Sequence, residues 1–271
     1  MTWTTLQRFD IGTGLACHRS GQGEPVVLIH GVGLRAEAWG AQIPVLARYF
    51  DVIAIDLPGH GHSALLSSET PSLADVSDAI AAAIQSVGRP VHLVGHSLGA
   101  LISLDCAIRF PELCRSLVPM NAIFQRTADA KRAVQARARA LLDGADAGTE
   151  QTLARWFGDR PRGYMGACAE ACRSWLLQNE GEGYARAYRV FSEQNGPSAK
   201  ALKQLDIPVT FVTGADDPNS LPHMSQAMAD LVPCGQAVSI TGAAHMLPMT
   251  HAEDVNQRLI KTMQFGEVEH V

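Results

Sequence analysis

The stretch that decides the fold runs from Val91 to Ala100 and reads VHLVGHSLGA. Its first four residues form a short apolar run typical of a buried strand, and the next five match the pattern G-x-S-x-G. In this pattern a serine occupies a sharp turn from strand to helix, where larger neighbours than glycine would collide. Because the pattern also occurs by chance, Ser97 needs a base, an acid and an oxyanion site elsewhere in the chain to be a nucleophile.

Outside this stretch, short apolar runs alternate with longer segments of helical periodicity. This alternation predicts an α/β fold, with a mostly parallel central sheet and helices on both faces. Pro119 lacks a backbone donor for an interior strand, and we interpret it as marking that strand's end. Strands are predicted at 26–30, 51–56, 91–94, 117–120, 208–213 and 237–240, and helices at 37–49, 73–87, 98–110 and 252–263.

The alternation breaks between residues 124 and 200, where nearly every segment has helical periodicity and the turns are rich in glycine and proline. We expect this block to be a helical cap inserted over one end of the sheet. The predicted core then comprises residues 1–123 and 201–271, with the cap at 124–200.

Ligands of open parallel sheets bind beyond the carboxyl ends of the strands, so the residues that follow each strand are informative. Three of the predicted strands are followed by residues that could form a catalytic site: Ser97 after 91–94, the Asp216–Asp217 pair after 208–213, and His245 after 237–240. A histidine can take the serine proton, and a carboxylate on its far ring nitrogen fixes the tautomer. Adjacent side chains of an extended turn point apart, so only one of the two aspartates should face His245.

An acyl-transfer site also needs backbone donors for the developing oxyanion. The N–H of Leu98 follows the candidate nucleophile at the start of a helix, and that of Val32 lies in the glycine loop after the first predicted strand. We therefore expect Val32 and Leu98 to form the oxyanion hole.

Composition narrows the function classes. The net charge of −5 and dispersed charges argue against nucleic-acid binding, and 46% hydrophobic residues can form a sizeable core. No apolar run reaches the length of a membrane span, and the N-terminus lacks a signal-peptide pattern, so a cytoplasmic protein is expected. The six cysteines form no C-x-x-C pair, and we expect no metal site and reduced packing cysteines.

The segments HGVG (30–33), DLPGHGHS (56–63), GHSLGA (95–100), GADD (214–217) and GAAHMLP (242–248) together resemble the α/β-hydrolase superfamily. The cap pieces RWF (155–157) and EGYARAY (182–188) resemble 3-oxoadipate enol-lactonases and related small esterases and lactonases. Ala100 departs from the glycine often found there in the family. In the G-x-x-D pattern of the family, Asp217 is the acid of the triad.

The resemblance implies a serine hydrolase that cleaves a small carboxylic ester or lactone through an acyl-enzyme on Ser97. No cofactor is expected, the partner is a small-molecule substrate, and a homodimer is left open. Cleavage of a carbon–carbon bond, or a ligand-binding or lyase role, are the alternatives. The candidate pocket residues are His30, Gly31, His96, Trp156, Trp175 and Tyr188.

Overall fold

The computed structural model describes residues 3–11, 13–145 and 148–265 and contains an eight-stranded sheet with the order β1-β2-β4-β3-β5-β6-β7-β8. The six strands from β3 to β8 run parallel, whereas β1 pairs antiparallel with β2 and β2 with β4. The strands are β1 (Phe9–Asp10), β2 (Ala16–Ser20), β3 (Glu24–Ile29), β4 (Phe50–Ile55), β5 (Val91–His96), β6 (Cys114–Met120), β7 (Val209–Gly214) and β8 (Gly235–Ile240).

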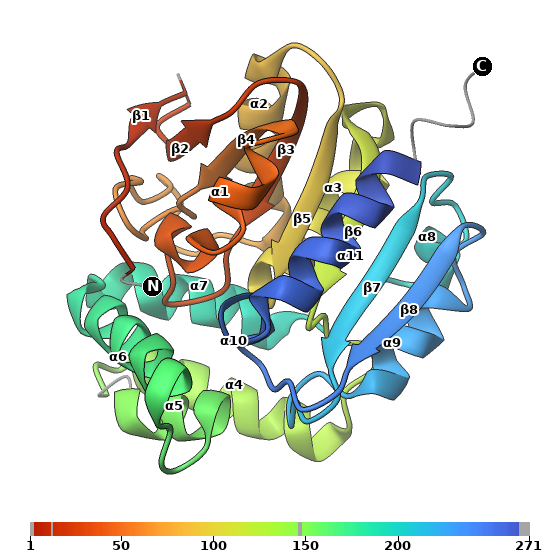
Figure 1. Cartoon of the computed structure of the whole chain (residues 1–271). Coiled ribbons are helices and arrows are strands. Elements are labelled where there is room, and N and C mark those ends of the chain that lie inside the picture. The colour runs from red at the N-terminus through yellow and green to blue at the C-terminus, as the bar shows by residue number, and fades with distance from the viewer. Residues whose placement is uncertain (1–2, 12, 146–147, 266–271) are drawn as a thin grey trace.

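Helices cover both faces of the sheet (Figure 1). Along β3, Val26 and Leu28 belong to one apolar cluster, and Val27 and Ile29 belong to the other. A strand buried on both faces needs apolar residues at every position, which explains the continuous run. The first face is covered by α1 (Ile43–Leu46), α10 (Leu247–Thr250) and α11 (Ala252–Phe265), and the second by α2 (Leu73–Val87), α3 (Leu98–Arg109) and α9 (Pro222–Ala229).

Four helices between β6 and β7 gather at one end of the sheet (Figure 1). They are α4 (Ala128–Leu142), α5 (Thr149–Phe157), α6 (Gly163–Gln178) and α7 (Gly181–Glu193), followed by the short α8 (Ala199–Leu202). The helices α4 and α7 pack together, as do α5 and α6. In the described parts of the chain, no helix is both long and apolar enough to cross a bilayer.

Several predicted elements differ from the structure. The single helix expected at 37–49 is a 3-10 turn (Ala36–Trp39) followed by α1, because Gly40 and Pro44 interrupt the segment. The antiparallel strands β1 and β2 were missed, since each is short and carries exposed polar residues. The strand with Pro119 begins three residues earlier than predicted, at Cys114, and ends at Met120 as predicted, so the proline lies one residue inside its end.

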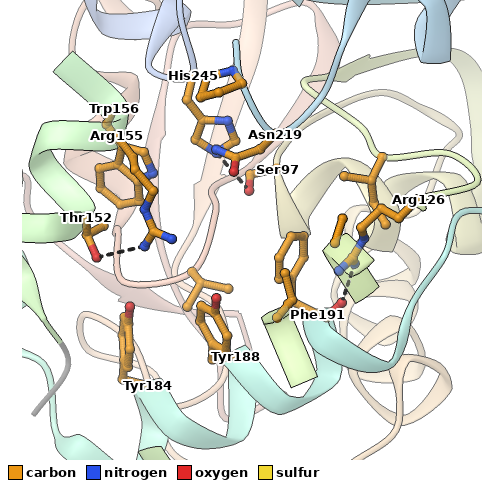
Figure 2. Close-up of a pocket in the computed structure, with 15 residues that line it drawn as sticks. Ser97, Arg126, Thr152, Arg155, Trp156, Tyr184, Tyr188, Phe191, Asn219 and His245 are labelled. Atoms are coloured by element: carbon orange, nitrogen blue, oxygen red, sulfur yellow. Dashed lines mark hydrogen bonds between the residues drawn. The ribbon is translucent and has the colours of Figure 1, made fainter. Parts of the chain in front are cut away.

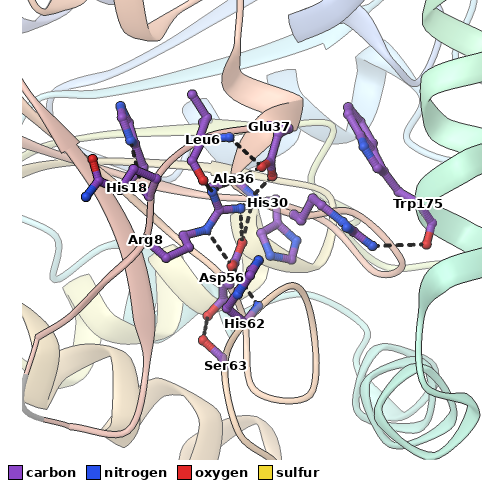
Figure 3. Close-up of polar contacts among 12 residues, drawn as sticks. Leu6, Arg8, His18, His30, Ala36, Glu37, Asp56, His62, Ser63 and Trp175 are labelled. Carbon is purple, nitrogen blue, oxygen red and sulfur yellow. Dashed lines mark hydrogen bonds and ion pairs between the residues drawn. The ribbon is translucent and has the colours of Figure 1, made fainter. Parts of the chain in front are cut away.

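A buried ion cluster joins the N-terminal segment to the sheet (Figure 3). The guanidinium of Arg8 contacts Asp56 (Nε to Oδ2, 2.7 Å) and Glu37 (Nη2 to Oε2, 2.5 Å). The exposed fractions of the Arg8, Glu37 and Asp56 side chains are 6%, 5% and 0%. Burial disfavours the charged form of Asp56, but the hydrogen bond and charge of Arg8, together with the N–H of Ala36 and other smaller contributions, outweigh it and leave the pKa of Asp56 below its usual value.

The same cluster positions two loops at the carboxyl edge of the sheet. Asp56 accepts hydrogen bonds from the N–H groups of Ala36 (2.8 Å) and His62 (2.9 Å). Ser63 Oγ donates to the carbonyl of Asp56 at 2.6 Å, which closes the turn that follows β4. Asp56 therefore braces this turn and also holds the loop that follows β3.

Candidate active site

The turn that carries Ser97 is strained in the way that the G-x-S-x-G pattern predicts. Ser97 has φ 57° and ψ −115°, in the left-handed range that non-glycine residues rarely adopt. A Cβ on Gly95 would lie 2.1 Å from the carbonyl oxygen of Gly99, and one on Gly99 would lie 2.2 Å from that of Ile29. Both positions therefore require glycine, and the turn lifts Ser97 to the carboxyl edge of the sheet at the start of α3.

Ser97, His245 and Asp217 form a continuous hydrogen-bonded relay. His245 Nε2 lies 3.1 Å from Ser97 Oγ, and His245 Nδ1 lies 2.8 Å from Asp217 Oδ2. Asp217 follows β7 and His245 follows β8, so three strand ends meet here. Of the two adjacent aspartates, the structure brings Asp217 to His245 and leaves Asp216 exposed.

Asp217 is buried and fully engaged. Its Oδ2 also accepts the amide of Asn121 at 2.5 Å, and its Oδ1 accepts the N–H of Asn219 at 2.8 Å. Burial alone would raise the pKa of Asp217, but His245 and these donors stabilise the carboxylate and lower its pKa to about 2. The carboxylate is therefore ionised at neutral pH and can stabilise an imidazolium at His245. No sequence pattern singled out Asn121, which lies directly after β6.

Two buried histidines fix the loop that follows β3. His30 Nδ1 donates to the Gly31 carbonyl at 2.8 Å, and its Nε2 accepts the N–H of Leu57 at 2.9 Å. His60 Nε2 accepts the N–H of Gly33 at 3.0 Å. Burial lowers the pKa of His30 to about 3 and that of His60 to about 4, so both rings are neutral and can accept these bonds.

Val32 and Leu98 are the residues whose N–H groups are predicted to form the oxyanion hole. Val32 lies in the loop after β3, and Leu98 lies at the start of α3. Val32 follows Gly31 in the braced loop, and a Cβ on Gly31 would lie 3.0 Å from Cβ of Ser97. Leu98 is the first residue of α3, where the backbone N–H has no partner within the helix. Leu98 directly follows Ser97, and Val32 lines the same pocket as Ser97, but an oxyanion hole formed by their two N–H groups stays a prediction.

His96 contacts His245 through both its ring and a hydrogen bond. Its Nε2 donates to the carbonyl of His245 at 2.7 Å, and the two ring centroids are 5.0 Å apart. Burial lowers the pKa of His96 to about 3. The neutral ring of His96 donates to the backbone of His245 and so helps to keep the His245 ring at hydrogen-bonding distance from Ser97.

The relay opens into a pocket of about 150 Å³ between the sheet edge and the cap helices (Figure 2). This volume is similar to that of a cavity which holds benzene, so the pocket suits a small substrate. The indole of Trp156 stacks over His245 with ring centroids 6.0 Å apart. The lining residues are Val32, Ser97, Ile123, Arg126, Ala130, Val134, Thr152, Arg155, Trp156, Tyr184, Tyr188, Phe191, Pro218, Asn219 and His245.

The pocket includes only part of the set predicted from the sequence. Among the described residues, Trp156 and Tyr188 line it, whereas Trp175, His30, Gly31 and His96 do not. Trp175 is a correction: it packs edge-on against Trp3, with centroids 6.2 Å apart. His30 and Gly31 instead bond to each other in the loop after β3, and His96 bonds to the carbonyl of His245. The sequence analysis did not predict Arg126 and Arg155 as pocket residues, because charged residues in loops and helices are usually exposed to solvent.

Comparisons with known proteins agree with this geometry. The sequence profile of the alpha/beta hydrolase family matches residues 26–258. An (E)-2-((N-methylformamido)methylene)succinate hydrolase of Acinetobacter baylyi is 37% identical, over 88% of this chain and 90% of its own. A pimeloyl-[acyl-carrier protein] methyl ester esterase of Methylococcus capsulatus is 30% identical, over 89% and 94%.

Among solved structures, a malate-bound thermophilic esterase from Thermogutta terrifontis superposes with a TM-score of 0.84 and 27% identity. The match covers 97% of this chain and 100% of that one. The expected fold, with its mostly parallel sheet, is therefore confirmed by both the topology and the comparisons. The chain therefore belongs to the alpha/beta hydrolase family.

Proposed function

We propose that this hydrolase cleaves a small carboxylic ester or lactone through an acyl-enzyme on Ser97. The observation that carries the proposal is the relay of 3.1 Å and 2.8 Å from Ser97 through His245 to Asp217. A serine hydroxyl becomes an effective nucleophile when a base at this distance takes its proton. The esterases among the similar proteins support the choice of an ester bond.

In the proposed cycle, Ser97 Oγ attacks the substrate carbonyl while its proton passes to His245 Nε2. The N–H groups of Val32 and Leu98 stabilise the oxyanion of the tetrahedral intermediate. His245 then gives the proton to the leaving alkoxide, and the acyl-enzyme remains. A water molecule deprotonated by His245 attacks the acyl carbonyl, and the released acid leaves Ser97 with its proton restored.

Amide hydrolysis is a second candidate for the same site. The Acinetobacter relative is named as a hydrolase of an N-methylformamido compound, which contains a carbon–nitrogen acyl bond. An amide would follow the same two acyl-transfer steps, with His245 protonating a leaving nitrogen instead of an oxygen.

The proposal is tested by labelling with a fluorophosphonate probe and by turnover of short p-nitrophenyl esters. Wild-type protein should be labelled and active, and Ser97→Ala should be neither. Ser103→Ala is a matched control, because Ser103 lies further along the same helix and its hydroxyl only donates to the Ala100 carbonyl. Absence of both labelling and ester turnover in folded wild-type protein would refute the proposal, and Ser97-dependent turnover of p-nitroacetanilide would favour the amide candidate.

A further inference from the structure

The pocket beside Ser97 has an unusual charge distribution. Its described lining contains two arginines, Arg126 and Arg155, and no aspartate or glutamate. Most of the remaining lining is apolar or aromatic. Burial of a charge without a counter-ion is costly, so a pocket for a neutral substrate would gain nothing from the buried guanidinium group of Arg126.

Arg126 is buried, with an exposed fraction of 9%, whereas Arg155 is exposed. Its Nη2 donates to the carbonyls of Phe191 and Gln194, each at 2.9 Å, and its guanidinium carbon lies 4.7 Å from the centre of the Phe191 ring. These contacts fix the side chain and connect it to α7. They leave Nε and Nη1 buried, with no hydrogen-bond acceptor in the described part of the chain.

Among the residues that the structure describes, no carboxylate pairs with Arg126. Desolvation by burial lowers its pKa to about 10. A guanidinium paired with a carboxylate has a raised pKa, as Arg8 does beside Asp56 and Glu37. The two backbone carbonyls thus satisfy Nη2 of Arg126, but they do not neutralise the charge of its guanidinium group.

Arg155 approaches the pocket from the opposite side (Figure 2). It comes from α5, and its Nη2 lies 3.5 Å from the hydroxyl of Thr152. Desolvation by burial and the nearby charge of Arg137 lower the pKa of Arg155. In the view of Figure 2, Ser97 and His245 lie between the two arginines, so an anionic substrate at Ser97 lies within the field of both.

We infer that the substrate of this hydrolase carries a carboxylate group, which Arg126 and Arg155 recognise as the cationic wall of the pocket. The inference rests on the proposed function, because it concerns the substrate that Ser97 would cleave. A planar guanidinium suits a carboxylate in both charge and hydrogen-bond geometry. The small volume restricts the substrate to a short acid in which the carboxylate is a few bonds from the scissile carbonyl.

The experiment compares charged esters with neutral isosteres of the same shape. Methyl hydrogen succinate against methyl succinamate tests a carboxylate on the acyl side, and acetoxyacetate against acetoxyacetamide tests one on the leaving-group side. Acid release gives kcat/KM for each. In at least one pair, wild-type protein should favour the acid by about tenfold or more, as expected for a hydrogen bond between charged groups.

Variants assign the preference to the arginines. Arg126→Gln should lower the ratio of acid to neutral kcat/KM about tenfold, and Arg126→Lys should lower it less because the charge remains. Arg155→Gln should also lower the ratio. Arg132→Gln is the control: this exposed arginine on α4 pairs with Asp129, and the ratio should stay within about twofold of wild type.

A wild-type measurement keeps the test valid if Arg126→Gln does not fold. Succinate should inhibit turnover of a neutral ester at a concentration at least about tenfold lower than succinamide does. Equal turnover of both members of each pair, equal inhibition, or a preference that survives both glutamine variants would overturn the inference. If neutral esters are still cleaved in a Ser97-dependent manner, the proposed function stands while the carboxylate recognition fails.

Discussion

Removal of the Arg8 side chain should destabilise the protein strongly, because it leaves two buried carboxylates without their cation. We consider Arg8→Met, which preserves much of the volume of the side chain. Glu37 and Asp56 have exposed fractions of 5% and 0%, so neither can recover its hydration without opening the structure. Breaking a buried ion pair by removing one partner costs about 3–5 kcal/mol.

This cost can be converted into a melting temperature. The entropy of unfolding is about 2.1 cal/mol/K per residue, so over 271 residues a loss of about 3–5 kcal/mol lowers Tm by roughly 5–9 °C. Differential scanning calorimetry at neutral pH and constant salt measures the shift. Arg132→Met is the matched control, since its ion pair is exposed and should change Tm by less than about 2 °C.

A shift of less than about 2 °C for Arg8→Met would refute this reasoning. It would mean that Glu37 and Asp56 take up protons or water at little cost when Arg8 is absent.

The pH dependence of stability gives a second test of whether Arg8 stabilises the charged form of Asp56. Because the folded pKa of Asp56 is lowered, its contribution to stability is present above the unfolded pKa and is lost as the pH falls through the folded pKa. In Arg8→Met this contribution should be smaller.

Three further outcomes follow from the relay, the turn and the buried histidines. Asp217→Asn should lower kcat by about 10⁴-fold with little change in Tm, as in other serine triads, and a loss below tenfold in ester assays would exclude its role. Gly99→Ala should destabilise the fold by about 3 kcal/mol in urea titrations, because the new Cβ meets a backbone carbonyl of β3, whereas Gly181→Ala, with open space around it, should not. The pKa values of His30 and His60 are lowered to about 3 and 4, so the unfolded chain binds more protons below pH 6.5. Each should therefore reduce the free energy of unfolding by up to about 1.4 kcal/mol per pH unit as the pH falls from 6.5 toward 4, and a flat profile from chemical denaturation over this range would contradict their neutral state.

The parallel sheet could be predicted because its strands are buried on both faces, which leaves continuous apolar runs in the sequence. The meeting of Ser97, His245 and Asp217 followed from the same fact, since the ends of parallel strands lie at one edge. The choice between Asp216 and Asp217 required a family pattern, and the structure brings Asp217 to the ring.

The cap pocket could not be read in the same way. Its helices have the periodicity of any packed helix, which does not show which residues face Ser97. Trp175 was expected there and instead packs on Trp3, a residue far away in the sequence. Arg126 lies in an irregular segment before α4, and only the three-dimensional packing shows that its charge is buried. Long-range pairings of this kind leave no local signal.

The left-handed backbone at Ser97 has a consequence for how the protein could be improved. The conformation costs about 1–3 kcal/mol in every folded molecule, whether or not substrate is bound. Glycine would adopt the same φ without this cost, so the residue that would be best for stability at position 97 is one that cannot react. Selection of variants for heat resistance alone would therefore favour loss of the nucleophile, and any such selection has to be coupled to a screen for turnover.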